Sequence, residues 1–429
     1  MKTLLINCSI IHPEQKLNEK KKDILLEDGV IKQIGNLSSG ISADKIIDLR
    51  NNYVVPGFFD MHVHLREPGR EDEETVVTGC NSAAQGGFTG VACMPNTDPA
   101  IDSAEVVKFI KEKAADHLVD VFTIAAATVG RKGEVLSPIA ELYEAGVVGF
   151  SDDGTTIKTS SILKRALEYS QMYKLPIIEH CEDESLSGGA MNESINSTLL
   201  GLPPIPSIAE DLIVMRDIIL AEYTKGKIHI AHISTKKAVQ LVREAKAKGI
   251  HVTAEVTPHH FTLTDDSLKT YDTNYKMNPP LRTRTDIDEI ILGLKDGTID
   301  CIACDHAPHS LEEKEAEFEY ASNGIVGLET SVGLSLSELL HKKILSLEQI
   351  VEKLSINPRK ILDQPIPQFK EGEMANFTLL DLNEVWTVDI SKFKSKSKNS
   401  PFDKRLLTGK SIGVVNNKKM LFDGDFFDL

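Results

Sequence analysis

Short apolar runs alternate with amphipathic segments over most of the chain, from residue 55 to about residue 365. Eight of these runs have the length and the continuous apolar character of buried parallel strands. We expect strands at residues 58–64, 90–94, 121–127, 147–151, 176–180, 227–232, 251–256 and 299–304. The segments between them, such as "SAEVVKFIKEKAADHL", carry apolar residues at helical spacing and predict helices that cover the strands.

The number of strand-and-helix units decides between two arrangements of a parallel sheet. Eight units in about 310 residues fit a (β/α)8 barrel of the TIM type better than an open, doubly wound sheet. The chain contains neither a G-x-G-x-x-G motif nor a Walker loop, so nothing supports the nucleotide site that an open sheet often carries. We therefore predict an α/β barrel and keep the doubly wound sheet as the alternative.

The two ends of the chain have a different pattern from the middle. Residues 1–54 and residues 366–429 contain strand-like pieces that are separated by turns. Neither end alone offers enough strands for a stable sheet. We predict that they pair into one small β-sandwich domain, which lies beside a catalytic barrel domain of residues 55–365.

Composition excludes several classes of protein. The chain has 429 residues, of which 41% are hydrophobic and 26% charged, as in an ordinary globular protein. Its formal net charge of −16 argues against nucleic acid as a partner, because phosphate binding needs a basic face. The first residues lack a signal-peptide run, and no segment approaches the roughly 18 apolar residues of a membrane span. Six cysteines do not make a disulfide framework in so long a chain, so we expect a cytoplasmic protein.

Histidines and aspartates stand at the C-terminal ends of several predicted strands, where barrel enzymes place their chemistry. His62, His64 and Arg66 end the first strand, and side chains two residues apart share one face of a strand. The other candidates are Asp152, Asp153, His180, His232, Asp305, His306 and His309, which follow strands four, five, six and eight. Four histidines and two aspartates on one rim form a nitrogen and oxygen set that suits zinc or a similar divalent ion.

Each of these residues also has a simpler interpretation. A single histidine at a strand end is usually a packing residue, and we assign His229 to packing because it lies on the opposite face from His232. Asp153 could cap the following helix, and the first strand could be an edge strand with a polar face. The coincidence of so many metal-type residues on one rim favours a metal site, with His62 and His64 as a ligand pair.

Seven motifs of the sequence resemble those of the dihydroorotase family, in its long bacterial-type branch within the cyclic amidohydrolases. They are "DMHVHLREPG", "MPNT", "FSDDG", "EHCED", "AHIST", "YKMNPPLR" and "DHAPH". They occur in the family's order and span nearly the whole chain. The resemblance implies a (β/α)8 barrel with a small β domain from both termini. It also implies zinc-dependent, reversible cyclisation of N-carbamoyl-L-aspartate to L-dihydroorotate in pyrimidine biosynthesis.

Matched by motif, the resemblance implies one or two zinc ions and two sets of site residues. The metal ligands would be His62, His64, Asp153, His180, His232 and Asp305, and Asp305 would also be catalytic. The substrate would bind to Arg66, Asn96, Asn278, His309, Asn323 and Gly324. The chain departs from the family at Ser322 and Asn323, where a Pro-Phe pair usually precedes the glycine. The contact there is expected through backbone groups, so the departure affects packing more than binding.

The opening of an amide ring suits these residue types. A metal lowers the pKa of bound water towards about 7, and a carboxylate can bridge two ions, a role that we expect for Asp153. Asp305 could bind metal through one oxygen and carry a proton with the other. Arg66 offers a planar fork for a carboxylate. Asn96 and Asn278 lie in turns, so a purely structural role stays open for both.

Two other functions stay open beside a dihydroorotase. A hydantoinase, dihydropyrimidinase or allantoinase would share the scaffold, but these relatives carry a carboxylated lysine after strand four, and this chain has no lysine there until Lys158. A non-catalytic dihydroorotase-like scaffold of aspartate transcarbamoylase would have lost ligands, and none is missing. We expect a small-molecule substrate, no nucleic acid, no membrane and a homodimer, while association with a transcarbamoylase is left open.

Three features have no assigned role. The functions of His259 and His260 stay open, with a structural role or support of the metal ligands as the alternatives. The acidic loop of residues 310–324 is either a lid or a plain solvated loop.

Overall fold

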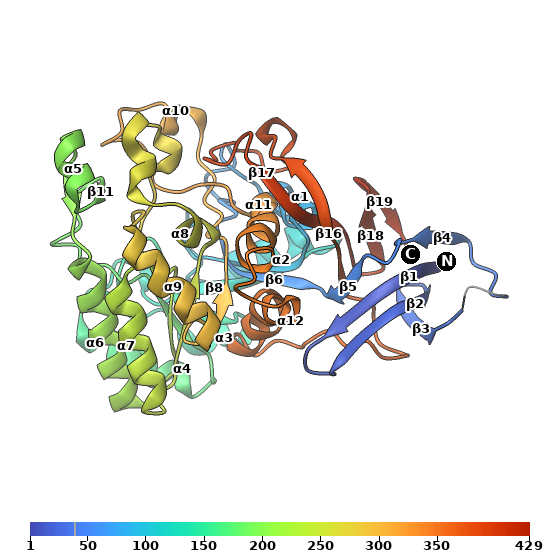
Figure 1. Ribbon diagram of the computed structural model, residues 1–429. Helices are drawn as coiled ribbons and strands as arrows, with labels where there is room; N and C mark the ends of the chain where they lie inside the picture. Colours follow the sequence, from blue (N-terminus) through green and yellow to red (C-terminus); the bar gives the residue numbers. More distant parts are fainter. Residues whose placement is uncertain (38–39) are drawn as a thin grey trace.

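The protein consists of a (β/α)8 barrel and a separate sheet built from both chain ends (Figure 1), and the computed structural model describes residues 1–37 and 40–429. The barrel strands are hydrogen-bonded in chain order from β6 to β15. They are β6 (Phe58–Val63), β7 (Phe88–Cys93), β8 (Asp120–Ala126), β9 (Gly149–Ser151), β10 (Ile177–Glu179), β13 (Ile228–Ile230), β14 (Val252–Val256) and β15 (Cys301–Ile302). All eight predicted strands are confirmed, each within two residues of its expected bounds.

The ring of strands closes between β15 and β6 through contacts at the ends of these strands. In the described part of the chain, the backbone pairing across this gap is a parallel bridge between Val63 and His306. His64 N donates a hydrogen bond to His306 O at 2.9 Å, and Cys304 N donates one to Asp60 Oδ2 at 2.9 Å. The closure therefore lies at the C-terminal end of β6, beside the metal-type residues.

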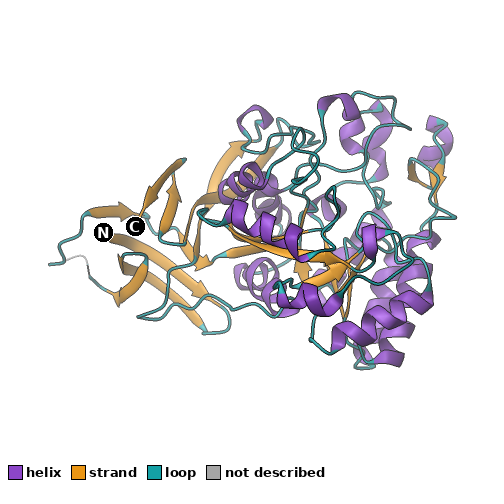
Figure 2. Ribbon diagram, turned by 180° about the vertical axis from the view of Figure 1, so that it is seen from behind, coloured by secondary structure: helices purple, strands orange, loops and turns teal. Residues whose placement is uncertain are grey.

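Strand side chains alternate between the barrel interior and the layer under the helices, as the period of a strand requires. Phe59 and Met61 belong to the interior cluster, whereas Phe58 and Val63 pack against the helices. The main covering helices are α1 (Val76–Gly86), α2 (Ala104–Ala114), α3 (Ile139–Glu144), α4 (Ser160–Gln171), α6 (Ile208–Thr224), α7 (Lys236–Ala247), α9 (Arg284–Asp296) and α11 (Leu328–Ser335). Figure 2 shows these helices around the strands. Among the residues that the structure describes, no helix is both long and apolar enough to cross a membrane.

Shorter helices lie in the loops above and below the barrel. They are α5 (Ile195–Leu200), α8 (Pro258–Thr262), α10 (Leu311–Lys314), α12 (Leu347–Val351) and α13 (Asn357–Ile361). Threonines that follow strand ends cap several helices: Thr159 accepts from Ile162 N at the start of α4, and Thr235 accepts from Ala238 N at the start of α7. Each such cap satisfies a free helix N–H and so fixes the preceding loop.

Both chain ends contribute to one nine-stranded sheet, which lies to one side of the barrel (Figure 1). Its strands are β1 (Lys2–His12), β2 (Leu17–Glu27), β3 (Val30–Gly35), β4 (Lys45–Asp48), β5 (Tyr53–Pro56), β16 (Phe377–Thr387), β17 (Leu406–Asn416), β18 (Lys419–Phe422) and β19 (Asp425–Asp428). The two ends meet where β5 pairs antiparallel with β16. These strands share an apolar cluster of their own. The small β domain is thus confirmed, while its limits at residues 54 and 366 stay a prediction.

Candidate metal centre

The six predicted ligands lie together at the C-terminal ends of the barrel strands. His62 is in β6 and His64 follows it, while the other four follow β9, β10, β13 and β15: Asp153, His180, His232 and Asp305. No side chain of the six is more than 11% exposed. Parallel strands that end at one rim bring residues from five separate segments into a single buried group.

Five of the six residues form two groups that share Asp153, and Asp305 lies beside them, with its Oδ1 3.6 Å from His62 Nε2. Asp153 Oδ1 lies 3.4 Å from His62 Nε2, 3.8 Å from His180 Nδ1 and 3.6 Å from His232 Nε2. Its Oδ2 lies 3.6 Å from His64 Nε2. The potential ligand atoms of His62, His64 and Asp153 lie within 4.8 Å of one another, and so do those of Asp153, His180 and His232. One carboxylate thus stands between two sets of imidazoles.

Unpaired polar atoms in this group test whether a metal fits. His62 Nε2 and Asp153 Oδ1 are buried and have no hydrogen-bond partner in the described structure. The imidazoles of His180 and His232 point nitrogen to nitrogen, with 3.1 Å between His180 Nδ1 and His232 Nε2. Buried polar groups without partners are costly, and a cation between these atoms would satisfy them. Imidazole nitrogens and carboxylate oxygens are also a usual zinc donor set, so the residues fit a divalent metal.

The carboxylates of the centre are held in their charged form. Burial alone would raise the pKa of Asp305, but the hydrogen bond from His64 and the charge of His62 lower it well below its ordinary value. For Asp153, burial would likewise raise the pKa, but the charges of His62 and His64 and the close approach of His232 lower it well below its ordinary value. Both groups are therefore anions at neutral pH, as metal ligands must be.

The backbone is strained where the site residues stand. Arg66, His232 and Asp305 adopt positive φ angles of 61°, 31° and 47°. Positive φ costs a non-glycine residue about 1–3 kcal/mol, and such residues gather at functional sites. All three residues follow the C-terminal ends of barrel strands, at the rim where the centre lies.

A second set of polar groups orients the imidazoles. His62 Nδ1 donates to Glu255 Oε1 at 2.5 Å, and His64 Nδ1 donates to Asn96 Oδ1 at 2.7 Å. His180 Nε2 lies 3.2 Å from Glu182 Oε2. In each case the other ring nitrogen is left for the centre, which is how partners of metal-binding histidines fix the tautomer and the ring position.

His229 and Glu255 extend this network below the centre. The His229 side chain contacts Thr253 Oγ1 at 2.8 Å and Glu255 Oε2 at 3.3 Å. Burial alone would raise the pKa of Glu255, but the charges of His62 and His229 lower it to about 2. His229 therefore packs away from the metal ligands, on the face that the sequence predicts, and supports His62 through a shared carboxylate.

Arg66 and His309 lie side by side near the centre. Arg66 Nε donates to Pro308 O at 3.0 Å and pairs with Glu73 at 3.1 Å, while Nη2 is 3.4 Å from His309 Nε2. His309 Nε2 donates to Asn323 O at 2.7 Å. No partner of Arg66 Nη1 occurs among the described residues, so part of the guanidinium fork remains available to a ligand.

The remaining candidates for substrate binding lie at the same rim. Asn278 Nδ2 donates to Glu182 Oε2 at 2.9 Å and is 3.3 Å from His180 Nε2. Gly324 has a φ of 116°, and a Cβ there would come within 2.6 Å of Ala307 Cβ. Because only glycine fits that conformation, the backbone at this position can approach a ligand closely.

Four residues of the site have no role in the predictions from sequence. Glu182 and Glu255 contact metal-type histidines, and Arg131 Nη2 donates to Asp153 O at 2.6 Å. His259 is buried with Nε2 unpaired, and burial lowers the pKa of His259 to about 4, so this imidazole is neutral. An acidic residue inside the apolar strand "VTAEV" was the one sequence signal that pointed to Glu255. His260, which follows His259 in the sequence, is structural, because its Nε2 contacts Pro279 O at 2.9 Å.

The acidic loop of residues 310–324 folds against itself. Lys314 Nζ donates to Ser322 O at 2.7 Å and to Gly324 O at 3.2 Å. Ser322 Oγ donates to Glu313 Oε2 at 2.9 Å, which closes the loop from its other side. Burial lowers the pKa of Lys314 to about 7. The loop is thus tied to the glycine that neighbours His309.

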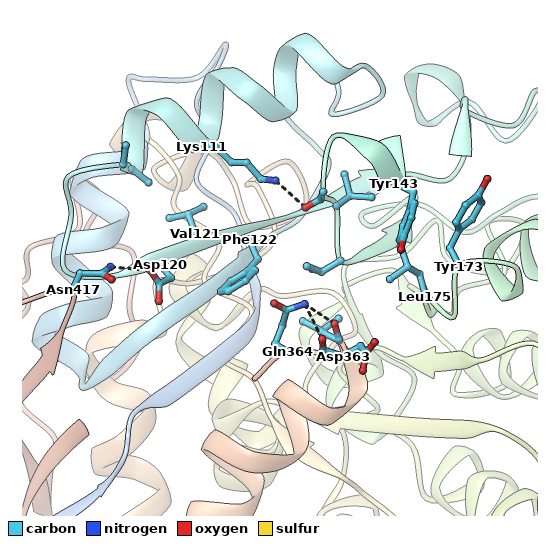
Figure 3. A pocket seen from close by; sticks show the side chains of 16 residues that line it. Lys111, Asp120, Val121, Phe122, Tyr143, Tyr173, Leu175, Asp363, Gln364 and Asn417 are labelled. Atoms are coloured by element: carbon cyan, nitrogen blue, oxygen red, sulfur yellow. Dashed lines mark hydrogen bonds between the residues drawn. The ribbon is translucent and has the colours of Figure 1, made fainter. Parts of the chain in front are cut away.

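A cavity of about 560 Å3 opens at the opposite end of the barrel (Figure 3). Lys111, Asp120 and Asn417 line it, but their polar groups pair with protein atoms. Lys111 Nζ donates to Ala145 O at 2.7 Å, and Asn417 Nδ2 donates to Asp120 Oδ1 at 2.8 Å. None of the six metal-type residues lines it, so this cavity is not part of the centre.

Sequence comparisons place the chain among proteins of one kind. A family model described as "Dihydro-orotase-like" matches residues 51–238. The chain is 52% identical over 389 residues to the dihydroorotase of Acetivibrio thermocellus, covering 90% of this chain and 91% of that protein. It is 46% identical over 426 residues to the dihydroorotase of Trichlorobacter lovleyi, covering 99% of this chain and 100% of that protein.

Solved structures support the fold. The L-hydantoinase (dihydropyrimidinase) of Arthrobacter aurescens aligns with a TM-score of 0.85 at 25% identity, covering 100% of this chain and 97% of that one. The dihydropyrimidinase of Brevibacillus agri aligns with a TM-score of 0.81 at 22% identity, covering 99% and 95%. Both have the barrel and small β domain arrangement seen here.

Proposed function

The chain belongs to the dihydroorotase family, and on this premise we propose how its residues perform the family's reaction. The protein is a metal-dependent cyclic amide hydrolase of pyrimidine biosynthesis that interconverts N-carbamoyl-L-aspartate and L-dihydroorotate. The single structural observation that carries the proposal is the position of Asp153 between two groups of buried imidazoles.

The metal of the proposal is zinc, one or two ions per chain. His62, His64 and Asp305 would hold one ion and His180 and His232 the other. Asp153 would be shared by both, because its Oδ1 lies within 3.8 Å of His62, His180 and His232. When bound, such ions lower the pKa of water and polarise the amide carbonyl.

Asp305 would move the proton in this reaction. Its Oδ1 lies 3.0 Å from His64 Nε2, and Oδ2 has no hydrogen-bond partner within the described chain. The lowered pKa of Asp305 keeps Oδ2 ionised at neutral pH. In ring opening, Oδ2 would accept the proton of the attacking water and give it to the amide nitrogen that leaves.

The substrate carboxylate would bind beside this centre. Arg66 and His309 would contact it directly, since their side chains are adjacent, and the Asn96 amide would complete the set. Asn278 and the backbone of Asn323 and Gly324 would contact the rest of the ring. The part of the Arg66 fork without a protein partner supports this assignment.

Dihydrouracil and hydantoin are expected to be turned over at least about a hundredfold less efficiently than dihydroorotate. Dihydrouracil shares the scissile amide but lacks the carboxylate, so it would leave the free part of the buried Arg66 fork without its ligand, at a cost of about 3 kcal/mol or more. The measurement is kcat/KM on each substrate for the parent and for Arg66→Met. The variant should lose most of the preference while retaining its metal, and comparable parent efficiency on dihydrouracil would favour a hydantoinase.

Asp153→Ala is expected to reduce the bound metal, most sharply at a second site, while the activity of the parent should not depend on bicarbonate. Asp153 takes the position that a carboxylated lysine holds in related amidohydrolases, so no lysine carbamate needs to form. Metal content by mass spectrometry, together with rates in bicarbonate-free buffer, measures both effects. Full metal content and full rate in the variant would reduce Asp153 to a structural residue.

The alternative functions receive less support from particular residues. Lys158, the nearest lysine after β9, is 52% exposed and pairs with Glu184 at 3.7 Å, away from the imidazoles. A hydantoinase-type lysine carbamate therefore has no candidate at the centre. A non-catalytic scaffold would not need four buried imidazoles arranged around Asp153.

The proposal extends to the setting of the enzyme. Because the reaction belongs to pyrimidine biosynthesis, we place the protein in the cytoplasm. We propose that it assembles as a homodimer, with an aspartate transcarbamoylase as the alternative partner. The barrel domain of residues 55–365 would carry the whole catalytic site.

A further inference from the structure

Glu73, His309 and Glu313 form a second cluster of metal-type residues beside the metal centre. Their potential ligand atoms lie within 4.8 Å of one another. His309 Nδ1 is 2.9 Å from Glu313 Oε2 and 3.2 Å from Glu73 Oε1. The side chain of Glu73 is 2% exposed and that of His309 is 12% exposed. Two carboxylates thus face one nitrogen of a largely buried imidazole.

Arginines occupy the carboxylates of this cluster, which argues against a further metal site. Arg66 Nε lies 3.1 Å from Glu73 Oε2. Arg70 Nη2 lies 3.0 Å from Glu73 Oε1 and 2.6 Å from Glu313 Oε1. A metal ion at this place would be repelled by both guanidinium groups. The two carboxylates therefore serve the side chains around them, which are Arg66, Arg70 and His309.

Both ring nitrogens of His309 face hydrogen-bond acceptors. Nδ1 faces the carboxylates of Glu73 and Glu313, and Nε2 lies 2.7 Å from Asn323 O. A neutral imidazole has one N–H, so it would leave one of these contacts without a proton. The doubly protonated imidazolium has two N–H groups and satisfies both. Burial alone would raise the pKa of Glu313, but hydrogen bonds from Arg70 and Ser322 lower it to about 2, so this partner of His309 is an anion.

The cluster has one positive charge in excess when His309 is protonated. Its cations are then Arg66, Arg70 and His309, and its anions are Glu73 and Glu313. Arg66 Nη2 and His309 Nε2 are only 3.4 Å apart. Two like charges this close repel each other unless anions stand beside them, and the two glutamates supply these anions. The excess charge matches the single carboxylate of dihydroorotate.

We propose that Glu73 and Glu313 are positioning residues that hold His309 as an imidazolium beside Arg66. Neither glutamate touches the substrate. Together they present two adjacent cations to the substrate carboxylate and so favour a substrate that carries this group. This role rests on the proposed function, in which Arg66 and His309 contact the carboxylate.

The backbone around His309 is held independently of the two glutamates. His309 N donates to Asn399 Oδ1 at 3.2 Å, and Asn399 Nδ2 donates to Ala307 O at 3.0 Å. Ser322 N donates to the backbone oxygen of Glu313 at 3.2 Å, which anchors this residue without its side chain. A change that removes only the charge of Glu313 therefore leaves the chain in place and acts on the imidazole.

Kinetics of Glu313→Gln tests the role of the charge. The variant keeps the size of the side chain but pairs His309 with a neutral group, and charged hydrogen bonds are the stronger ones. KM for dihydroorotate should rise about tenfold, while kcat should change less than about twofold, because the substrate carboxylate stays away from the reacting amide. Glu312→Gln is the matched control, since Glu312 is the exposed neighbour in α10, and it should keep the parent KM. A parent KM in Glu313→Gln, or a loss confined to kcat, would contradict the proposal.

A double-mutant cycle shows whether Glu313 acts through His309. His309→Asn alone should raise KM, and the addition of Glu313→Gln should change KM little further, because the imidazole that the carboxylate holds is gone. Effects of the two changes that multiply would mean that Glu313 acts by another route, and the proposal would fail.

Nitrogen NMR of protein with isotope-labelled histidine tests the charge of His309 without any substrate. The signal absent from His309→Asn identifies this residue. At neutral pH the parent should show two protonated ring nitrogens for His309, and the Glu73→Gln, Glu313→Gln double variant should show one. A neutral His309 in the parent would overturn the proposal even if dihydroorotate is the substrate. A parent that does not turn over dihydroorotate would instead refute the proposed function, and the NMR result would still decide whether the glutamates hold the imidazolium.

Discussion

Removal of bound metal is expected to abolish ring opening completely, and zinc alone is expected to restore it. Without a cation, the amide faces water whose pKa is about 15.7 rather than about 7, so the nucleophile is almost absent at neutral pH. The buried His62 Nε2 and Asp153 Oδ1 would also lose the ion that satisfies them. Hydrolysis of dihydroorotate measured before dialysis against a chelator, after it and after addition of zinc tests this expectation.

Two controls make the metal experiment decisive. Circular dichroism of the dialysed protein separates loss of metal from loss of fold, since the barrel has its own apolar clusters. Magnesium should not restore activity, because it prefers oxygen ligands and octahedral geometry over imidazoles. A fully active protein that contains no transition metal would end the proposed mechanism.

Asp305→Asn is expected to lower kcat by about a hundredfold to ten-thousandfold, the usual contribution of a positioned acid–base group. Asparagine keeps an oxygen for the metal but cannot accept a proton at neutral pH. Bound metal should fall much less than activity, because His62 and His64 remain. The measurement is kcat in both directions of the reaction, together with metal content.

Asp183→Asn is the matched control for this change. Asp183 lies in the same rim segment as His180, but its Oδ1 accepts from Ser185 N at 2.9 Å and it contacts none of the ligands. This variant should keep a rate within a few-fold of the parent. If Asp305→Asn also kept a rate within a few-fold of the parent, Asp305 would have no role in proton transfer.

The barrel and the convergence of the candidate ligands at one rim could be predicted from the sequence, because both depend on simple periods. Continuous apolar runs mark parallel strands, and the residues after them reach one rim in any such barrel. This reasoning brought His62 and Asp305 together although 242 positions separate them in the sequence. This prediction needs only the order of the strands and does not depend on the exact path of the backbone between them.

Residues that act through contacts across the ring could not be placed in the same way. Glu255 supports His62 from β14, and Arg131 reaches Asp153 from a loop after β8, so both roles depend on distances that no local pattern contains. The orientation of helix α6 is a similar case. The segment "DLIVMRDIILAEY" is apolar on both sides, and the sequence alone does not tell which side faces the barrel.

The closure of the ring between β15 and β6 links metal supply to the lifetime of the folded chain. His64 lies on one side of this gap and Asp305 on the other, so an ion held by both joins two segments whose backbone pairing is a single bridge. A ligand that binds only the native state stabilises it in proportion to the logarithm of its free concentration. Scarcity of the proposed metal would thus slow the enzyme and also shorten its survival against unfolding and proteolysis.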